Sequence, residues 1–301
     1  MTDLAGYAIG IDIGVTNVKH VCVTASGRIL RQASLSTDAD SPDWPANIRR
    51  LVESIEQERG PAFAVGLAAP GLVSDNGSRI AWMQGRLDQI QGLNWTEFLG
   101  RDSLTPILND AHAALLGEGW LGAARGMQNV LMLTLGTGVG GALMVDGRLL
   151  RGHIGRAGHL GHISLNPAGS LDIVNTPGSL EEAIGNCTVR QRSHGKFQTT
   201  HDLIAAYEAG DARAAEIWLA SIRALAAGLA SLINVADPQI AIIGGGIARA
   251  SRSLFEPLVR AMDQFEWRPN GSRVRIEPAQ LGEYAGALGA ARNALTRDQN
   301  A

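Results

Sequence analysis

The sequence has few of the residues and segments that mark several classes of protein. Only two cysteines, Cys22 and Cys187, occur among its 301 residues, too few for a disulfide framework or a cysteine-built zinc site. The net charge of −3 provides no basic excess to neutralise nucleic-acid phosphates. The apolar run at 130–145 is interrupted by glycines and is too short to span a bilayer, and no leader pattern opens the sequence. We therefore expect a soluble cytoplasmic protein without a nucleic-acid or membrane partner.

The pattern of apolar residues predicts an α/β protein. Apolar residues make up 45% of the sequence, enough for a substantial core. Alternating or continuous apolar runs predict strands at 7–13, 18–23, 63–68, 106–108, 130–134, 141–145 and 239–243. Helical spacing predicts helices at 45–58, 111–118 and 213–236. The design of strand, glycine turn and strand at 7–23 recurs at 130–145, which suggests two similar half-structures.

Three glycine turns directly follow apolar strands, and they lie around Gly14, Gly136 and Gly244. Glycine allows backbone N–H groups to approach an anion closely. No turn matches the P-loop or the dinucleotide-binding pattern, and a lone turn of this kind is more often a simple hairpin. Three together, two of which carry a threonine, favour a nucleotide clamp. Asp12, just before the first turn, could reach Mg²⁺ through water.

Asn109 and Asp110 end one predicted strand and precede a helix of small residues. Taken alone, this pair is typical of a helix N-cap. Phosphoryl transfer to a hydroxyl, however, also needs a carboxylate within hydrogen-bond reach of that hydroxyl. Both interpretations remain open from the residues themselves.

Eight short motifs, in this order, resemble those of the ROK family of sugar kinases. They are Ile-Gly-Ile-Asp-Ile-Gly-Val-Thr-Asn-Val-Lys (9–19), Ala-Ala-Pro-Gly-Leu-Val (68–73), Leu-Asn-Asp-Ala-His-Ala-Ala (108–114), Leu-Gly-Thr-Gly-Val-Gly-Gly (135–141), Gly-Arg-Ala-Gly-His-Leu-Gly-His (155–162), Gly-Ser-Leu-Glu (178–181), Ile-Gly-Gly-Gly-Ile (243–247) and Gly-Ala-Leu-Gly-Ala-Ala (286–291). Each motif is weak alone, but all eight in the family's order are specific and cover nearly the whole chain. The resemblance implies an actin-like/hexokinase (ribonuclease H-like) fold, with two α/β domains around an interdomain cleft. It implies a smaller domain at 1–120, completed by a C-terminal helix at 286–301, and a larger domain at 121–285.

The resemblance also implies the substrates, ATP with Mg²⁺ and a sugar, and the role of each matching residue. Asp110 matches the catalytic aspartate that takes the proton of the sugar hydroxyl. The positions that match sugar-binding residues are Gly71, Asn109, His159, His162 and Glu181. The positions that match nucleotide-binding residues are Asp12, Gly14, Thr16, Asn17, Gly136, Thr137, Gly138, Gly244, Gly245 and Gly246.

The sequence departs from the family pattern at the first phosphate loop and at the zinc site. Val15 stands where the family usually has a second glycine, and it would be strained if that position required a positive φ. We expect instead that the turn keeps its shape and loses some room. Many members have three zinc-binding cysteines between the histidine and the glutamate, and here these positions hold Asp172, Val174 and Ser179. We therefore expect no structural zinc, and we expect apolar packing within the 163–180 loop to replace it, through Leu171, Ile173 and Val174.

His159 stands where glucose-type members have a glutamate. A neutral imidazole offers one donor and one acceptor and cannot accept two hydroxyls as a carboxylate does. The same replacement resembles bacterial N-acetylmannosamine kinases, which makes N-acetylmannosamine the favoured sugar. The alternative is neutral drift that leaves glucose as the substrate. His162, without zinc, would serve the sugar or only hold a local hydrogen bond.

Three functions are compatible with parts of this pattern. The first is a kinase that phosphorylates the 6-hydroxyl of a hexose or N-acetylhexosamine. The second is a sugar-responsive repressor, which would carry a helix-turn-helix domain before the first phosphate loop; that loop begins near Met1, so we expect none. The third is a non-catalytic sugar sensor, against which Asp110 argues. The resemblance further implies a homodimer or a dimer of dimers.

Overall fold

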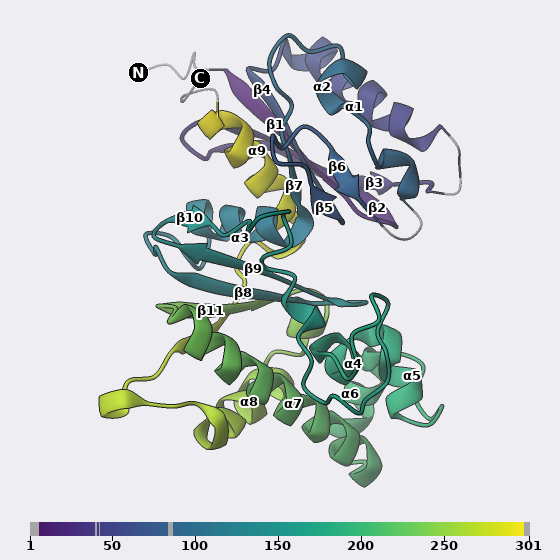
Figure 1. Ribbon diagram of the computed structural model, residues 1–301. Helices are drawn as coiled ribbons and strands as arrows, with labels where there is room; N and C mark the ends of the chain where they lie inside the picture. Colours follow the sequence, from purple (N-terminus) through teal and green to yellow (C-terminus); the bar gives the residue numbers. More distant parts are fainter. Residues whose placement is uncertain (1–5, 40, 42, 84–86, 298–301) are drawn as a thin grey trace. The chain divides into compact units, whose positions relative to one another are not determined.

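The computed structural model describes residues 6–39, 41, 43–83 and 87–297 (Figure 1). The chain divides into two compact units. The first unit comprises Met1–Gly126, Arg151–Ala157 and Gln280–Ala301, and the second comprises Met127–Leu150 and Gly158–Ala279. The sequence predicted boundaries after residues 120 and 285. The segment Arg151–Ala157, which lies in the first unit, was not anticipated.

A five-stranded mixed sheet forms the centre of the first unit, in the order β3-β2-β1-β4-β7. The strands are β1 (Tyr7–Ile13), β2 (Asn17–Thr24), β3 (Ile29–Ser36), β4 (Ala64–Ala69) and β7 (Ile107–Asn109). The first three are antiparallel neighbours, whereas β4 is parallel to β1 and to β7. A small separate ribbon pairs β5 (Leu72–Val73) with β6 (Ile80–Trp82).

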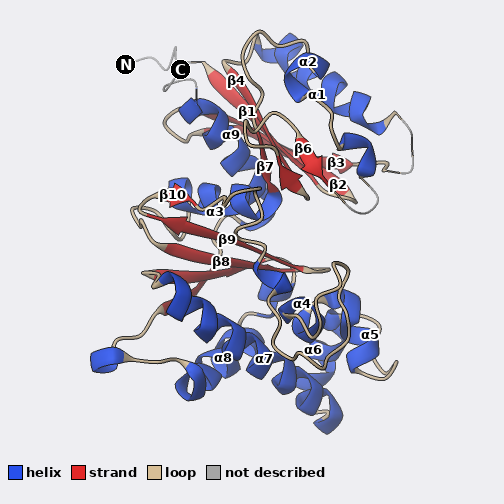
Figure 2. Ribbon diagram, in the orientation of Figure 1, coloured by secondary structure: helices blue, strands red, loops and turns tan. Residues whose placement is uncertain are grey.

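Helices cover both faces of this sheet (Figure 2). One face packs against α1 (Trp44–Arg59) and α2 (Trp95–Phe98), and the other against α9 (Ala285–Arg297), which in turn contacts α3 (Asp110–Leu121). The alternation of β1 explains this arrangement, because successive side chains point to opposite faces. Ile9, Ile11 and Ile13 join the core with α1, and Ala8 joins the core with α9.

Glycine allows α9 to lie unusually close to its neighbours. A Cβ atom on Gly10 of β1 would overlap the carbonyl oxygen of Ala287 in α9. Where α3 meets α9, a Cβ atom on Gly289 would overlap the carbonyl oxygen of Ala113. Two helices or a helix and a sheet approach this closely only where no side chain intervenes.

The second unit contains another five-stranded sheet, in the order β10-β9-β8-β11-β12. Its strands are β8 (Val130–Leu135), β9 (Val139–Val145), β10 (Arg148–Leu149), β11 (Ile240–Gly244) and β12 (Arg275–Pro278). Helices α7 (Ala212–Ala236) and α8 (Arg252–Phe265) pack on one face of it (Figure 2), and α4 (Leu180–Ile184) and α6 (Thr200–Glu208) contact α7. The short helix α5 (Val189–Arg192) contributes Val189 to the same core.

Helix α7 is long and apolar enough, by length and composition, to cross a membrane. Half of its most apolar window is nevertheless buried inside the unit. Leu225, Leu229 and Ile233 belong to the core that also includes the strands β8 and β11. A central core helix meets the same criteria of length and apolarity, so α7 is explained by its packing.

Substitution of Gly289 by alanine tests the close contact between α3 and α9. Gly289→Ala should lower the free energy of unfolding by about 1–3 kcal/mol, because the new methyl group forces the helices apart. The matched control is Gly228→Ala in α7, where a Cβ atom would make ordinary contacts of 3.5 Å with Ile163, Leu165 and Leu180. Alanine favours a helix by about 1 kcal/mol over glycine, so the control should be neutral or stabilising. Urea unfolding measures both, and equal effects of the two substitutions would contradict the interpretation.

Candidate functional site

The first predicted phosphate loop is the turn between β1 and β2. The backbone N–H of Gly14 donates to the carbonyl oxygen of Asn17 at 3.0 Å, and the hydroxyl of Thr37 donates to the carbonyl oxygen of Gly14 at 2.6 Å. Val15 is not among the residues with positive φ, and its side chain is partly exposed, at 38%. The valine therefore sits in this turn without backbone strain. Its neighbours Thr16 and Asn17 are exposed on the same turn.

Asp12 lies at the end of β1, and its carboxylate is in an unfavourable environment for a charge. A Cβ atom on Gly286 of α9 would be 2.6 Å from its Oδ2 atom, which shows how closely the helix covers it. Burial, followed by the negative charge of Asp110, raises the pKa of Asp12 to about 7, against the opposing effect of Lys19. Burial and a like charge both disfavour the ionised carboxylate. The structure thus places the first phosphate loop and the predicted catalytic aspartate close enough to interact.

Asn109 links the end of β7 to the start of α3. Its Oδ1 atom accepts hydrogen bonds from the N–H groups of Ala111 at 3.0 Å and His112 at 3.4 Å, as an N-cap does. Its Nδ2 group donates to the carbonyl oxygen of Gly71 at 3.3 Å and has a second N–H. The N-cap interpretation is therefore right for Asn109, whereas Asp110 is the first residue of the helix and is exposed.

Gly71 needs to be glycine at its position. Its φ is +107°, and a Cβ atom would lie 2.7 Å from the carbonyl oxygen of Trp82. A cavity of about 350 Å³ opens beside Asn109, within the first unit. Its lining includes His112, whose Nε2 atom is 2.9 Å from the carbonyl oxygen of Ala157. Three predicted residues of the first unit, Gly71, Asn109 and Asp110, are thus adjacent.

The second predicted phosphate loop is the turn between β8 and β9. The N–H of Gly136 donates to the carbonyl oxygen of Gly138 at 2.9 Å, and the carbonyl oxygen of Thr137 accepts from the N–H of Cys187 at 2.8 Å. Glu181, predicted to contact the sugar, accepts the N–H of Val139 through Oε2 at 2.9 Å. Any side chain on Gly138 would overlap that carboxylate. Glu181 therefore supports this loop, a role that the sequence did not reveal.

The third glycine turn follows β11. Gly245 has a φ of +86°, and a Cβ atom there would overlap the backbone of Leu135. Gly244 ends the strand, and Gly246 precedes a short 3₁₀ turn, Ile247–Ala250. The turn consequently lies against the end of β8, next to the second phosphate loop.

A cavity of about 630 Å³ lies within the second unit beside these two turns. Its lining residues include Gly136, Thr137 and Gly246, which the sequence predicted to bind nucleotide. The lining residues that the sequence analysis missed include Asn186, Thr200, His201, Glu208 and Arg249. The hydroxyl of Thr200 is buried and has no hydrogen-bond partner among the residues that the structure describes, so a ligand could satisfy it. No local pattern distinguishes these residues from ordinary helix-capping and surface residues.

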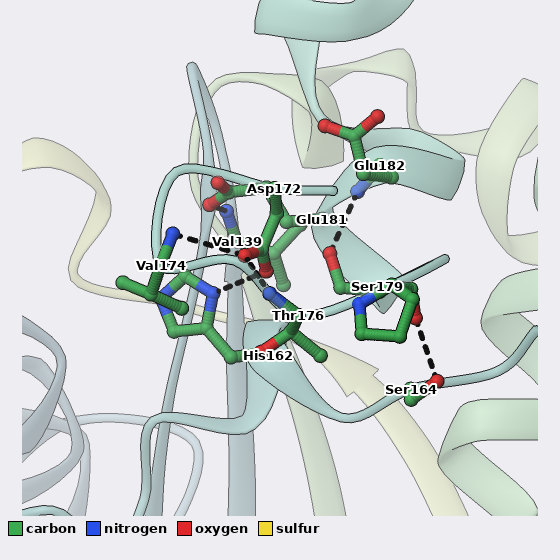
Figure 3. A network of polar contacts seen from close by, with 10 residues as sticks. Val139, His162, Ser164, Asp172, Val174, Thr176, Ser179, Glu181 and Glu182 are labelled. Atoms are coloured by element: carbon green, nitrogen blue, oxygen red, sulfur yellow. Dashed lines mark hydrogen bonds and ion pairs between the residues drawn. The ribbon is translucent and has the colours of Figure 1, made fainter. Parts of the chain in front are cut away.

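One buried carboxylate, that of Asp172, links several residues of the 163–180 loop (Figure 3). Asp172 Oδ2 is 2.8 Å from His162 Nδ1. Asp172 Oδ1 accepts the N–H groups of Val174 at 3.0 Å and Thr176 at 2.8 Å. Burial alone raises the pKa of Asp172, but hydrogen bonds from His162, Thr176, Ser179 and Val174 outweigh it and hold the pKa below its usual range.

This arrangement corrects the expectation that apolar packing holds the loop. Leu171 is 61% exposed, Ile173 is 59% exposed and Val174 is also exposed. They cannot anchor the loop, because their side chains face solvent. His162 and the three positions where zinc-binding cysteines were expected, Asp172, Val174 and Ser179, are instead joined through the Asp172 carboxylate. Over the described part of the chain, no group of three or more His, Cys, Asp or Glu side chains is placed to hold a metal ion; the absence of structural zinc stays a prediction.

The remaining predicted residue, His159, directly precedes the 3₁₀ turn Leu160–His162 in the second unit. It is partly buried, and its backbone adopts φ −76° and ψ 62°. His159 thus lies one turn before His162, whose Nδ1 atom contacts Asp172. What His159 recognises stays a prediction.

Comparison with known proteins identifies the chain's relatives. The model of the ROK family matches residues 8–297. The chain belongs to the ROK family. A glucokinase from Thermotoga maritima is 31% identical, over 94% of this chain and 95% of that protein. The crystal structure of a ROK hexokinase from Thermus thermophilus matches with a TM-score of 0.83 and 30% identity, over 98% of this chain and 100% of that one.

A third relative bears on the choice of sugar. It is a Listeria monocytogenes protein described as a candidate N-acetylmannosamine kinase, with a TM-score of 0.83 and 27% identity, over 97% of this chain and 99% of that one. Together these findings confirm the predicted family and the actin-like α/β fold class. The matches span the ROK chains over nearly their full lengths, so the likeness is not confined to one motif.

The pH dependence of stability tests the environment of Asp12. Since its pKa in the folded protein lies above the ordinary value, the folded state keeps a proton that the unfolded state has lost between about pH 4 and pH 7. Ionisation of Asp12 should therefore lower the free energy of unfolding as the pH rises, by up to about 1.4 kcal/mol per pH unit. Asp12→Asn lacks this titration, so its stability relative to the wild type should increase between pH 4 and pH 7.

The matched control is Asp211→Asn. The hydrogen bond from Lys196 lowers the pKa of Asp211 below its ordinary value of 3.8, so its stabilising effect is lost only below about pH 4, and the relative stability of Asp211→Asn should stay constant between pH 4 and pH 7. Chemical unfolding at a series of pH values measures both. Parallel stability curves for the wild type and Asp12→Asn would show that Asp12 is not perturbed.

Proposed function

We propose that this protein is an ATP-dependent sugar kinase that transfers the γ-phosphate to the 6-hydroxyl of a hexose or N-acetylhexosamine, N-acetylmannosamine being the favoured substrate. The proposal rests on a cluster of residues in the first unit. There Asp110 follows Asn109, which is hydrogen-bonded to Gly71, and the negative charge of Asp110 helps to raise the pKa of Asp12. Phosphoryl transfer to an alcohol needs a base for the hydroxyl proton and groups that position the phosphates, and Asp110 and the first phosphate loop are candidates for these roles.

The proposed reaction uses Asp110 as the general base. Its carboxylate takes the proton of the sugar hydroxyl as the hydroxyl oxygen forms a bond to the γ-phosphorus. The bond between that phosphorus and the oxygen bridging to the β-phosphate breaks, and ADP leaves with the electron pair. Backbone N–H groups of the phosphate loops, around Gly14 and Gly138, would stabilise the charge on the phosphoryl oxygens. The candidate sugar-binding residues are Gly71, Asn109, His159, His162 and Glu181.

Asp12 fits a role in holding Mg²⁺ through water. Its carboxylate is partly buried and interacts with a second carboxylate, Asp110, and this mutual repulsion is what a divalent cation relieves. When bound with ATP, the ion would neutralise charge on the phosphates. The neighbouring backbone of Gly14, Thr16 and Asn17 would bind the phosphates themselves.

ATP is assigned to the cavity of about 630 Å³ in the second unit. That volume is typical of sites for small ligands. Thr137 and Gly246 line it at the two glycine turns, and the hydroxyl of Thr200, which has no partner among the described residues, offers a hydrogen bond to the nucleoside. Gly244 and Gly245 bring the third turn close to the end of β8, where a nucleotide could lie against backbone.

The preference for N-acetylmannosamine rests on His159, in place of a glutamate, and on the Listeria relative. The alternative is a glucokinase or another hexokinase, as the Thermotoga maritima relative is named, and a further alternative is a non-catalytic sugar sensor. We also propose a cytoplasmic homodimer or dimer of dimers without structural zinc. Sugar and ATP are its partners, with no role for nucleic acid or membrane.

Substitution of Asp110 tests the catalytic assignment. Asp110→Asn should lower kcat by at least about 100-fold, because general base catalysis contributes about 10²–10⁴-fold. ATP binding should stay within about twofold, since the amide preserves the shape of the side chain. Asp102→Asn, an exposed position in the same unit, is the control and should be as active as the wild type. Sugar phosphorylation by Asp110→Asn near the original rate would rule out Asp110 as the base.

A panel of sugars tests the substrate. With ATP consumption as the readout, N-acetylmannosamine should give kcat/KM at least about tenfold above glucose, mannose, allose and fructose, the equivalent of about 1.4 kcal/mol. His159→Glu should shift the preference toward glucose, because a carboxylate accepts two hydroxyl hydrogen bonds. Much better use of glucose by the wild type would overturn the interpretation of His159 and leave the kinase assignment in place.

A further inference from the structure

The contact between Asp172 and His162 determines where the proton lies on the His162 ring. The carboxylate pKa is held below its usual range, so Asp172 is ionised near neutral pH and has no proton to give. At a separation of 2.8 Å, Nδ1 of His162 must then supply the hydrogen. The neutral ring is therefore protonated at Nδ1, which leaves Nε2 with a lone pair.

Asp172 is well placed to impose this tautomer, because it is itself fixed. Its side chain is completely buried, with 0% exposure. Its Oδ1 atom is occupied by the N–H groups of Val174 and Thr176. The carbonyl oxygen of Asp172 also accepts the N–H of Asn175 at 2.9 Å, and its N–H donates to Thr176 at 3.0 Å. With these contacts, only Oδ2 is directed at the imidazole.

The other side of the ring is available to a ligand. The His162 side chain is 24% exposed. Among the residues that the structure describes, Asp172 is its hydrogen-bond partner, through Nδ1 alone. Nε2, as an unprotonated nitrogen, can accept a hydrogen bond from a hydroxyl group, and the ionised carboxylate behind the ring strengthens it as an acceptor.

We propose that Asp172 is a positioning residue for sugar binding: it fixes His162 as the Nδ1–H tautomer, so that Nε2 accepts a hydrogen bond from a sugar hydroxyl. This inference rests on the proposed function, in which His162 contacts the sugar. The proposal assigns a specific function to Asp172, a buried charged residue whose apolar neighbours Leu171 and Ile173 are exposed. It also defines the chemical character of the recognised group, a hydroxyl donor and not an acceptor.

Asp172→Asn tests the tautomer with little change of shape. The single amide oxygen is needed by the N–H groups of Val174 and Thr176, which can only donate. The NH₂ group then faces Nδ1 of His162, which must become an acceptor. The neutral ring should therefore switch to the Nε2–H tautomer.

Long-range ¹H–¹⁵N spectra of protein labelled at histidine distinguish the tautomers directly. The His162 signals are assigned by their loss in His162→Gln. The wild type should show Nδ1–H for His162, and Asp172→Asn should show Nε2–H. An Nε2–H tautomer in the wild type would overturn the proposal, and this measurement stands even if the variant fails to fold.

Sugar kinetics supply the functional half of the test. For Asp172→Asn, KM for the sugar substrate should rise at least about tenfold, because Nε2–H no longer accepts from the sugar hydroxyl, which has to rotate and accept instead. KM for ATP and kcat should stay within about twofold. Ser164→Ala is the matched control, because it removes another hydrogen bond of the same loop, from the Ser164 hydroxyl to the carbonyl oxygen of Pro177 at 2.6 Å, without touching His162. It should alter neither the tautomer nor the sugar KM.

The results distinguish a failure of the proposal for Asp172 from a failure of the proposed kinase function. A switched tautomer with an unchanged sugar KM refutes the role of Asp172 in sugar binding while the kinase assignment stands. A rise of KM in Ser164→Ala equal to that in Asp172→Asn would mean that only loop stability matters, which also refutes it. A wild-type protein that phosphorylates none of the sugars refutes the proposed function, whereas the tautomer spectra then still decide whether Asp172 fixes His162.

Discussion

Close approach of backbone to backbone at glycine is the constraint on which much of this structure depends. In the first unit, Gly10 and Gly66 on the sheet and Gly117 and Gly289 at the helix contact leave no room for a side chain. They bring α9 onto β1, and Gly286 brings it onto the carboxylate of Asp12. The burial that raises the pKa of Asp12 is thus a consequence of glycine packing. In the second unit, Gly245 similarly brings the third turn against β8.

Asp172, which is buried, and Asp12, which is partly buried, show how environment separates structural from functional roles. Asp172 is surrounded by donors, and its pKa is lowered despite burial. Asp12 faces another carboxylate, and its pKa is raised to about 7. Hydrogen bonds to the charged form favour ionisation, whereas burial beside a like charge opposes it. The first residue therefore stabilises a loop, and the second holds an unfavourable charge at a candidate phosphate site, as perturbed groups at functional sites often do.

In the 163–180 loop, hydrogen bonds join the three positions at which zinc-binding cysteines were expected. Asp172 provides a carboxylate at one of the three positions expected for thiolates. The backbone N–H of Val174 and the side chain of Ser179, at the other two positions, hydrogen-bond to this carboxylate, as does His162. A zinc ion holds its ligands through metal–ligand bonds, whereas Asp172 holds these groups as a hydrogen-bond acceptor. The exposed Leu171 and Ile173 then need no packing partner to keep the loop in place.

The sequence by itself determined the family, the glycine turns after β1, β8 and β11, and the positions of α1 and α7, but it did not predict β3 or α8. Apolar spacing predicted α1 and α7 to within a residue or two of their observed ends, because helical periodicity is a local property of near neighbours. The tertiary structure alone decided that Asp172 is buried against His162, that Asp12 interacts with Asp110, and that Thr200 lines a cavity. It also placed Arg151–Ala157 in the first unit. Burial, pKa and the partner of a polar atom depend on groups far away in the chain, so no local pattern encodes them.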